Sequence, residues 1–110
     1  MANRTIPVSE ANAMIMEYLG YMTEHKINMQ SQTQSAAFNK DGLLDYINTV
    51  KDYTDEFRIF FGVYPAGTKI GRMTTIIWPY KDGKPAQRPS QGKDGGNTDF
   101  DPYNDGSLNP

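Results

Sequence analysis

The stretch RIFFGVYPAGTKIGRMTTIIWPY, residues 58 to 80, is the most apolar part of this 110-residue chain. Two segments rich in β-branched and aromatic residues flank the turn-forming residues PAGTK at positions 65 to 69. This composition favours two antiparallel strands joined as a hairpin. Side chains of a strand alternate between its two faces, and here both faces are apolar. We therefore expect both faces of the predicted sheet to be covered, one of them by a second copy of the chain.

The two faces of the predicted strands differ in character. One face is aliphatic and rich in phenylalanine, which predicts the core, and it comprises Phe57, Ile59, Phe61 and Val63. The other face combines aromatic rings with arginines. Its residues are the candidate interface residues, together with two aromatic residues near the C-terminus: Arg58, Phe60, Tyr64, Arg72, Trp78, Tyr80, Phe100 and Tyr103.

Two helices are expected before these strands. From about Ser9, the predicted N-cap, to Glu24, apolar side chains recur at the spacing of one helix face, at Ala11, Met14, Ile15, Tyr18, Leu19 and Met22. The second helix follows Asn39, another good N-cap, and its apolar stripe comprises Leu43, Leu44, Ile47 and Val50. The polar connector between the helices, residues 26 to 38, is predicted to be a loop.

These elements predict an α+β fold in which two helices pack on one face of a small antiparallel β-sheet. A single domain is expected over residues 1–84, which end on KDGK, an Asp-Gly hairpin signal with at most a short edge strand after it. Residues 85–110 form a C-terminal tail rich in Gly, Pro, Asp and Asn, a composition that favours disorder. We expect contacts made by Phe100 and Tyr103 to order this extended tail.

Charge is distributed unevenly along a chain whose net charge is only −2. Residues 1–56 contain four Lys or Arg and eight Asp or Glu, residues 57–93 contain seven and one, and residues 94–110 contain none and four. An acidic tail and a basic strand region are complementary. The tail is therefore predicted to cross the aromatic sheet face, with Asp99 and Asp101 near Arg58 or Arg72, in its own subunit or a neighbour's.

The residues that most catalytic or metal sites need are scarce. The chain has no cysteine and one histidine, His25, and shows neither a nucleophile elbow nor a phosphate-binding loop. A spacing similar to a calcium loop occurs at Asn97, Asp99, Asp101 and Asp105, but Pro102 stands where such a loop needs a turn glycine. We predict a protein that is not an enzyme and has no catalytic residue, no cofactor and no metal.

Four short motifs together resemble a family of small uncharacterised proteins common in Bacteroidota. The motifs are IPVSEANAMIMEYL, FNKDGLLDYI, RIFFGVY and DPYNDGSLNP, and they span most of the chain. The resemblance implies one domain and a bacterial origin. It implies no activity, because none of the motifs is catalytic.

The sequence thus predicts a non-enzymatic self-assembling or protein-interaction protein whose interface is the aromatic sheet face and the tail. The alternative is a single-stranded nucleic-acid-binding module, since bases stack on aromatic rings beside basic residues, but the acidic tail disfavours nucleic acid as a partner. No run approaches the roughly 20 apolar residues of a membrane span, and the N-terminus lacks the apolar core of a signal peptide. We therefore expect a cytoplasmic homo-oligomer, or a complex with another protein, and no membrane partner.

Overall fold

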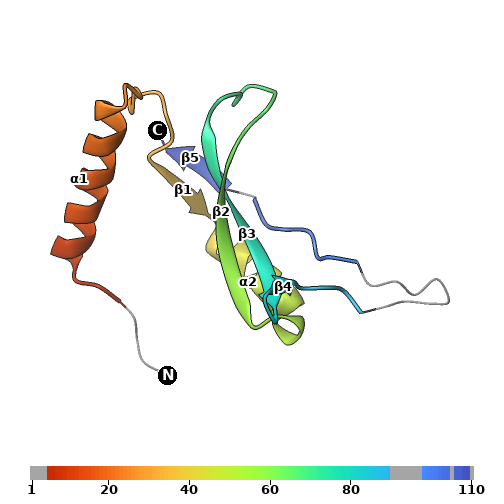
Figure 1. The fold of residues 1–110 in the computed structure, drawn as a ribbon. Helices are drawn as coiled ribbons and strands as arrows, with labels where there is room; N and C mark the ends of the chain where they lie inside the picture. The colour runs from red at the N-terminus through yellow and green to blue at the C-terminus, as the bar shows by residue number, and fades with distance from the viewer. Residues whose placement is uncertain (1–4, 90–97, 105, 110) are drawn as a thin grey trace.

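The computed structural model describes residues 5–89, 98–104 and 106–109, and it confirms the α+β fold class. Two helices, one short 3-10 helix and two antiparallel sheets make up the described chain (Figure 1). In chain order the elements are α1 Val8–Glu24, β1 Ser35–Phe38, α2 Lys40–Val50, η1 Lys51–Tyr53, β2 Glu56–Val63, β3 Met73–Lys81, β4 Lys84–Pro85 and β5 Gly106–Asn109.

The hairpin of β2 and β3 is the centre of the three-stranded sheet, whose strand order is β2-β3-β4. Its register pairs Arg58 with Trp78 and Ile59 with Ile77. The predicted turn at KDGK connects β3 to β4, and Asp82 and Gly83 both have positive φ angles, of 53° and 78°. Such angles are typical of the tight turns that match strand twist, so the sequence signal is confirmed here.

The second sheet joins two segments that lie far apart in the sequence. β1 pairs with β5 in antiparallel register, from Ser35 opposite Asn109 to Phe38 opposite Gly106. A side chain at Gly106 would have its Cβ only 2.9 Å from the Phe38 ring, so glycine permits this close approach. The prediction that residues 26 to 38 form only a loop was wrong, because β1 lies at the end of that connector.

The tail lies along the edge of β3 and not across the aromatic face. Ile77 and Tyr103 exchange two backbone hydrogen bonds, of 2.9 and 2.8 Å, and the Phe100 N–H donates to the Ala86 carbonyl. Asp101 forms an ion pair with Arg88 at 3.3 Å, whereas Arg58 pairs with Glu56 at 2.7 Å. Asp101 therefore pairs with Arg88, a residue of the tail itself, and not with Arg58 as predicted.

Helix α2 begins as predicted, because Asn39 caps it by accepting a hydrogen bond from the Gly42 N–H at 2.9 Å. Its Tyr46 ring lies 4.9 Å from the Tyr103 ring. Opposite residues of an antiparallel pair point to the same face, so Tyr103 places α2 on the sheet face that carries Ile77. The few fully or nearly buried residues of the described chain include Val50, Pro79 and Ala86.

Helix α1 differs from the prediction in its packing. It begins at Val8, after Pro7 and not after Ser9, and none of its residues is buried in the described structure. Figure 1 shows α1 standing apart from the sheets, to which only the connector joins it. The radius of gyration, 17.2 Å, exceeds the roughly 13 Å expected for a compact chain of this length. Only one of the two predicted helices therefore packs on the sheet.

Candidate functional site

The β2 apolar row is the most exposed apolar part of the sheet, and it comprises Phe57, Ile59, Phe61 and Val63. Phe61 is 86 % exposed, and Ile59 and Val63 are each 59 % exposed. These residues were predicted to be the core, and that prediction was wrong. The register places them on the same face as Ile77, where α2 lies, but α2 reaches the sheet at the tail and leaves β2 uncovered.

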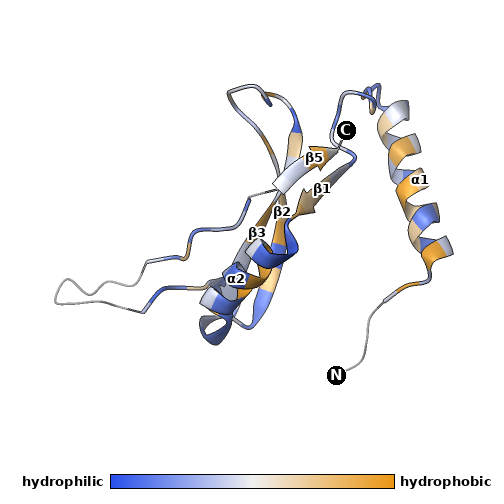
Figure 2. Cartoon of the chain, turned by 180° about the vertical axis from the view of Figure 1, so that it is seen from behind, coloured by the Kyte–Doolittle hydropathy of each residue, from blue (hydrophilic) through white to orange (hydrophobic). Residues whose placement is uncertain are grey.

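A second apolar surface follows helix α1. The α1 stripe comprises Ala11, Met14, Ile15, Tyr18, Leu19 and Met22, and it combines exposed with half-exposed residues. Met14 is 58 % and Ile15 54 % exposed. Figure 2 shows apolar bands along this helix where no other element lies against it. Most helix stability in proteins comes from packing of an apolar face, so α1 requires a surface to pack on.

A groove of about 330 Å³ separates the C-terminal half of α1 from the end of the sheet. Tyr18 and Met22 line it on the helix side, and Phe61 and Met73 line it on the sheet side. Phe61 belongs to the β2 apolar row, and the other three residues of that row are not among the described residues that line the groove. The two apolar surfaces thus lie near each other at one corner without forming a joint core.

The aromatic face lies on the opposite side of the hairpin and comprises Arg58, Phe60, Trp78 and Tyr80. The Phe60 and Trp78 ring centroids are 5.7 Å apart in an edge-to-face arrangement, and the Arg58 guanidinium carbon lies 4.1 Å above the Tyr80 ring. Trp78 is half-buried, and its buried Nε1 has no hydrogen-bond partner among the described residues. The structure therefore brings together four of the eight predicted interface residues.

The other four predicted residues lie elsewhere. Tyr64 and Arg72 flank the hairpin loop, where the Tyr64 N–H donates to the Arg72 carbonyl at 3.0 Å. Phe100 and Tyr103 lie in the tail segment along β3, and their rings contact the region of α2 and η1. Phe100 is 5.6 Å from Tyr53, while Tyr103 contacts Tyr46 and Phe38. The two tail aromatics thus join the tail to its own subunit.

The contact between α2 and the tail includes a hydrogen bond whose donor is Tyr46. The Tyr46 hydroxyl donates to the Asp101 carbonyl at 2.8 Å. Burial, with a smaller contribution from the Asp101 carboxylate, raises the pKa of the Tyr46 hydroxyl above its ordinary value of 10.0. The folded state therefore favours the protonated hydroxyl, and this contribution to stability is lost as the pH rises above 10.

We expect Tyr46→Phe to change the response of the protein to alkali. The variant loses one hydrogen bond, which lowers the free energy of unfolding at neutral pH by about 0.5–1.5 kcal/mol. Above pH 10 its stability should fall less steeply than that of the unaltered protein, as measured by urea unfolding between pH 7 and pH 11. Tyr53→Phe is the control and should keep the original pH profile, since it leaves Tyr46 intact. Parallel profiles for the Tyr46→Phe variant and the unaltered protein would contradict the assignment.

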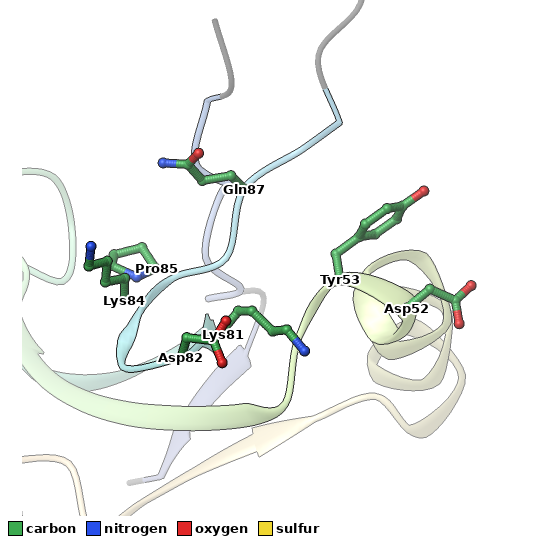
Figure 3. A pocket seen from close by; sticks show the side chains of 7 residues that line it. All are labelled: Asp52, Tyr53, Lys81, Asp82, Lys84, Pro85 and Gln87. Atoms are coloured by element: carbon green, nitrogen blue, oxygen red, sulfur yellow. The ribbon is translucent and has the colours of Figure 1, made fainter.

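A polar pocket of about 620 Å³ lies between η1 and the turn from β3 to β4 (Figure 3). Its lining residues are Asp52, Tyr53, Lys81, Asp82, Lys84, Pro85 and Gln87. Figure 3 shows these side chains spreading apart, with Lys84 and Gln87 on one side and Tyr53 and Asp52 on the other. Among the described lining residues, two lysines and two aspartates balance in charge, and their side chains do not converge on one point.

The acidic residues of the tail do not form a cluster in the described chain. Asn97 and Asp105 of the calcium-like spacing lie outside the described residues, and Asp101 pairs with Arg88. Within residues 5–89, 98–104 and 106–109, no group of three or more His, Cys, Asp or Glu side chains is placed to hold a metal ion. None of the helices in these ranges has the length and apolar character of a membrane span.

Sequence reasoning missed the exposed β2 apolar row because alternation reveals which side chains share a face but not what covers that face. The apolar character of both faces of β2 correctly predicted that one face needs a cover from outside the helices, but the aliphatic face was assigned to the helices and the aromatic face to the second copy. With one face aromatic and the other aliphatic, a single nearby helix could not bury them both.

Comparisons with protein-family models, with curated proteins and with solved structures find no match for this chain.

Proposed function

We propose that this chain is a non-enzymatic self-assembling protein whose interface includes the β2 apolar row and the α1 stripe. The observation that carries the proposal is the exposure of Phe61, Ile59 and Val63 on one strand face. Soluble monomers rarely expose a contiguous apolar patch of this kind. Covering these side chains with a second chain removes apolar surface from water, which is the main driving force of stable association.

The aromatic face is the smaller part of the proposed interface. Its rings pack on one another, and Trp78 and Tyr80 are half-buried within one chain. The proposed interface therefore differs from the sequence-based prediction, since Phe100 and Tyr103 contact their own subunit and the β2 apolar row takes their place.

The alternative, a single-stranded nucleic-acid-binding module, has less support. Such modules need cationic side chains that are available to phosphates. Arg58 already contacts the Glu56 carboxylate through two hydrogen bonds, of 2.9 and 2.7 Å, and stacks on Tyr80. The arginine at the centre of the aromatic face is thus engaged within the chain.

Membership of the Bacteroidota family and a cytoplasmic location are part of the same proposal. The first is supported by the four short motifs, and the second is the expectation stated in the sequence analysis. Fractionation of a bacterium that encodes the chain would test the location.

The particle mass in solution tests self-assembly. We expect light scattering at micromolar protein concentration to give at least twice the mass of one chain, and the same mass in 1 M NaCl, because an apolar interface is not screened by salt. A single-chain mass at every concentration would overturn the proposal. Tight binding of single-stranded DNA that weakens steeply with salt would favour the alternative.

A further inference from the structure

We propose that two copies of this chain exchange their α1 helices, so that α1 of each copy packs on the β2 apolar row of the other. This inference rests on the proposed function and names its partner, a second copy of the same chain. It follows from four features of the described structure: a vacant half of a sheet face, a helix of matching length, opposite charge, and a fixed direction of the helix.

The first feature is the vacant half of one sheet face. On the face that carries Ile77, the tail and α2 cover one side of β3, since Tyr103 pairs with Ile77 and packs on Tyr46. The neighbouring strand on the same face presents the β2 apolar row, in which Phe61 is 86 % exposed. The vacant region is therefore a strip beside a helix that is already docked, as in a two-layer α+β fold.

The second feature is the match between the vacant strip and α1. Eight residues of β2 extend over about 26 Å, and the 17 residues of α1 extend over about 25 Å. The α1 stripe runs along the helix from Ala11 to Met22 and contains no charged residue. A helix of this length can thus cover the whole β2 apolar row.

The third feature is the opposite net charge of the two segments. Residues 8–24, which form α1, contain three glutamates and no Lys or Arg. Residues 57–81, which form most of the hairpin, contain four Lys or Arg and no Asp or Glu. One of them, Arg58, lies on the opposite, aromatic face and pairs with Glu56. Complementary charge at the rim of an apolar contact favours the correct pairing of surfaces.

The fourth feature is the fixed end of α1, which holds the helix off its own β2 row. Lys26 has a positive φ of 64°, and the Ile27 N–H donates a hydrogen bond to the Met22 carbonyl. These two features cap the C-terminus of α1. The connector is then attached to the start of β3, because Gln32 Oε1 accepts from the Met73 N–H at 2.7 Å and Gln32 Nε2 donates to the Gly71 carbonyl.

Both ends of the connector are thus fixed, and Figure 1 shows α1 standing beside the sheets and apart from them. A second copy related by a two-fold axis covers both apolar surfaces, because α1 of each copy packs on the β2 apolar row of the other. Exchange of an identical element is a common route to closed dimers.

A complementation experiment tests the exchange. Ile15→Glu places a charge in the α1 stripe, and Phe61→Asp places one in the β2 apolar row. Ile15 is 54 % and Phe61 86 % exposed, so both variants should fold, as circular dichroism can verify. We expect each variant alone to have the mass of one chain. An equimolar mixture should contain particles of twice that mass, because α1 of the Phe61→Asp chain is intact and so is the β2 row of the Ile15→Glu chain.

The outcomes separate this inference from the proposed function. If the unaltered protein is an oligomer but the mixture stays monomeric, self-assembly stands and the exchange is overturned, since a helix that packs on its own sheet gains nothing from mixing. If Ile15→Glu alone remains an oligomer, the helix is not in the interface and the exchange is again overturned. A monomeric unaltered protein would overturn both.

Discussion

Phe61→Asp is expected to reduce the particle in solution to a single chain while leaving the helix and strand content unchanged. Phe61 is 86 % exposed in one chain, so the substitution removes little packing within the subunit. In a symmetric dimer the same change occurs twice. Loss of a buried phenylalanine costs about 2 kcal/mol at each position, and the two together raise the dissociation constant about a thousandfold. Burial of an unpaired carboxylate adds to this effect.

Analytical ultracentrifugation over a range of protein concentrations would measure the change. Ile70→Asp is the matched control, because Ile70 is 64 % exposed but lies in the hairpin loop away from the β2 apolar row. It should keep the mass of the unaltered protein. Equal masses for the unaltered protein and the Phe61→Asp variant would show that the β2 apolar row is not the interface.

The elements that could be predicted from the sequence are those that local patterns define. The periodicity that predicts a helix over residues 9 to 24 agrees with α1, and the Asn39 side chain caps α2 as its position before the second helix indicates. The alternation of residues 57 to 64 agrees with β2 up to Val63. In each case the signal lies within a few residues, because capping and side-chain direction are local properties.

The pairing of β1 with β5 could not be predicted in this way. Ser35–Phe38 and Gly106–Asn109 are four residues each, and their partners are about 70 residues apart in the sequence. Strands this short carry too little alternation to be recognised alone. Phe100 and Tyr103 indicated that the tail is ordered, but their partners on α2 and η1 depend on the path of the tail along β3.

The placement of the first helix shows a second limit of local patterns. The α1 stripe predicts that this helix packs on something, and the β2 apolar row predicts that this strand is covered. Neither pattern predicts the direction in which the chain leaves α1. That direction depends on the backbone conformation of Lys26 and on the hydrogen bonds of Gln32. Apolar faces that are complementary in sequence can therefore remain separate within one chain.

Phe100→Ala combined with Tyr103→Ala is expected to remove most of the stability of the single subunit. Both rings are half-buried, and truncation of a fully buried aromatic ring to Ala costs 3–5 kcal/mol, so a loss of about 2 kcal/mol at each position is reasonable. The sum, about 4 kcal/mol, is large beside the roughly 5–15 kcal/mol of a typical domain. Few side chains of this chain are fully buried, which favours the lower end of that range.

The measurement is urea unfolding in the Phe61→Asp background, so that loss of assembly does not contribute to the change. Ile70→Ala is the control, because this exposed side chain lies away from the tail, and it should change the free energy of unfolding by less than about 0.5 kcal/mol. A loss below 1 kcal/mol for the double variant would mean that the two rings do not hold the tail.

The two single variants extend the argument, because the rings have separate partners. Phe100 contacts Tyr53, whereas Tyr103 contacts Tyr46 and Phe38. Changes at positions without shared partners are usually additive, so the losses of the single variants should sum to that of the double variant. Tyr103→Ala should have the larger effect, since its ring contacts both Tyr46 of α2 and Phe38 of β1. A larger effect of Phe100→Ala would place the main tail contact at η1 instead of α2.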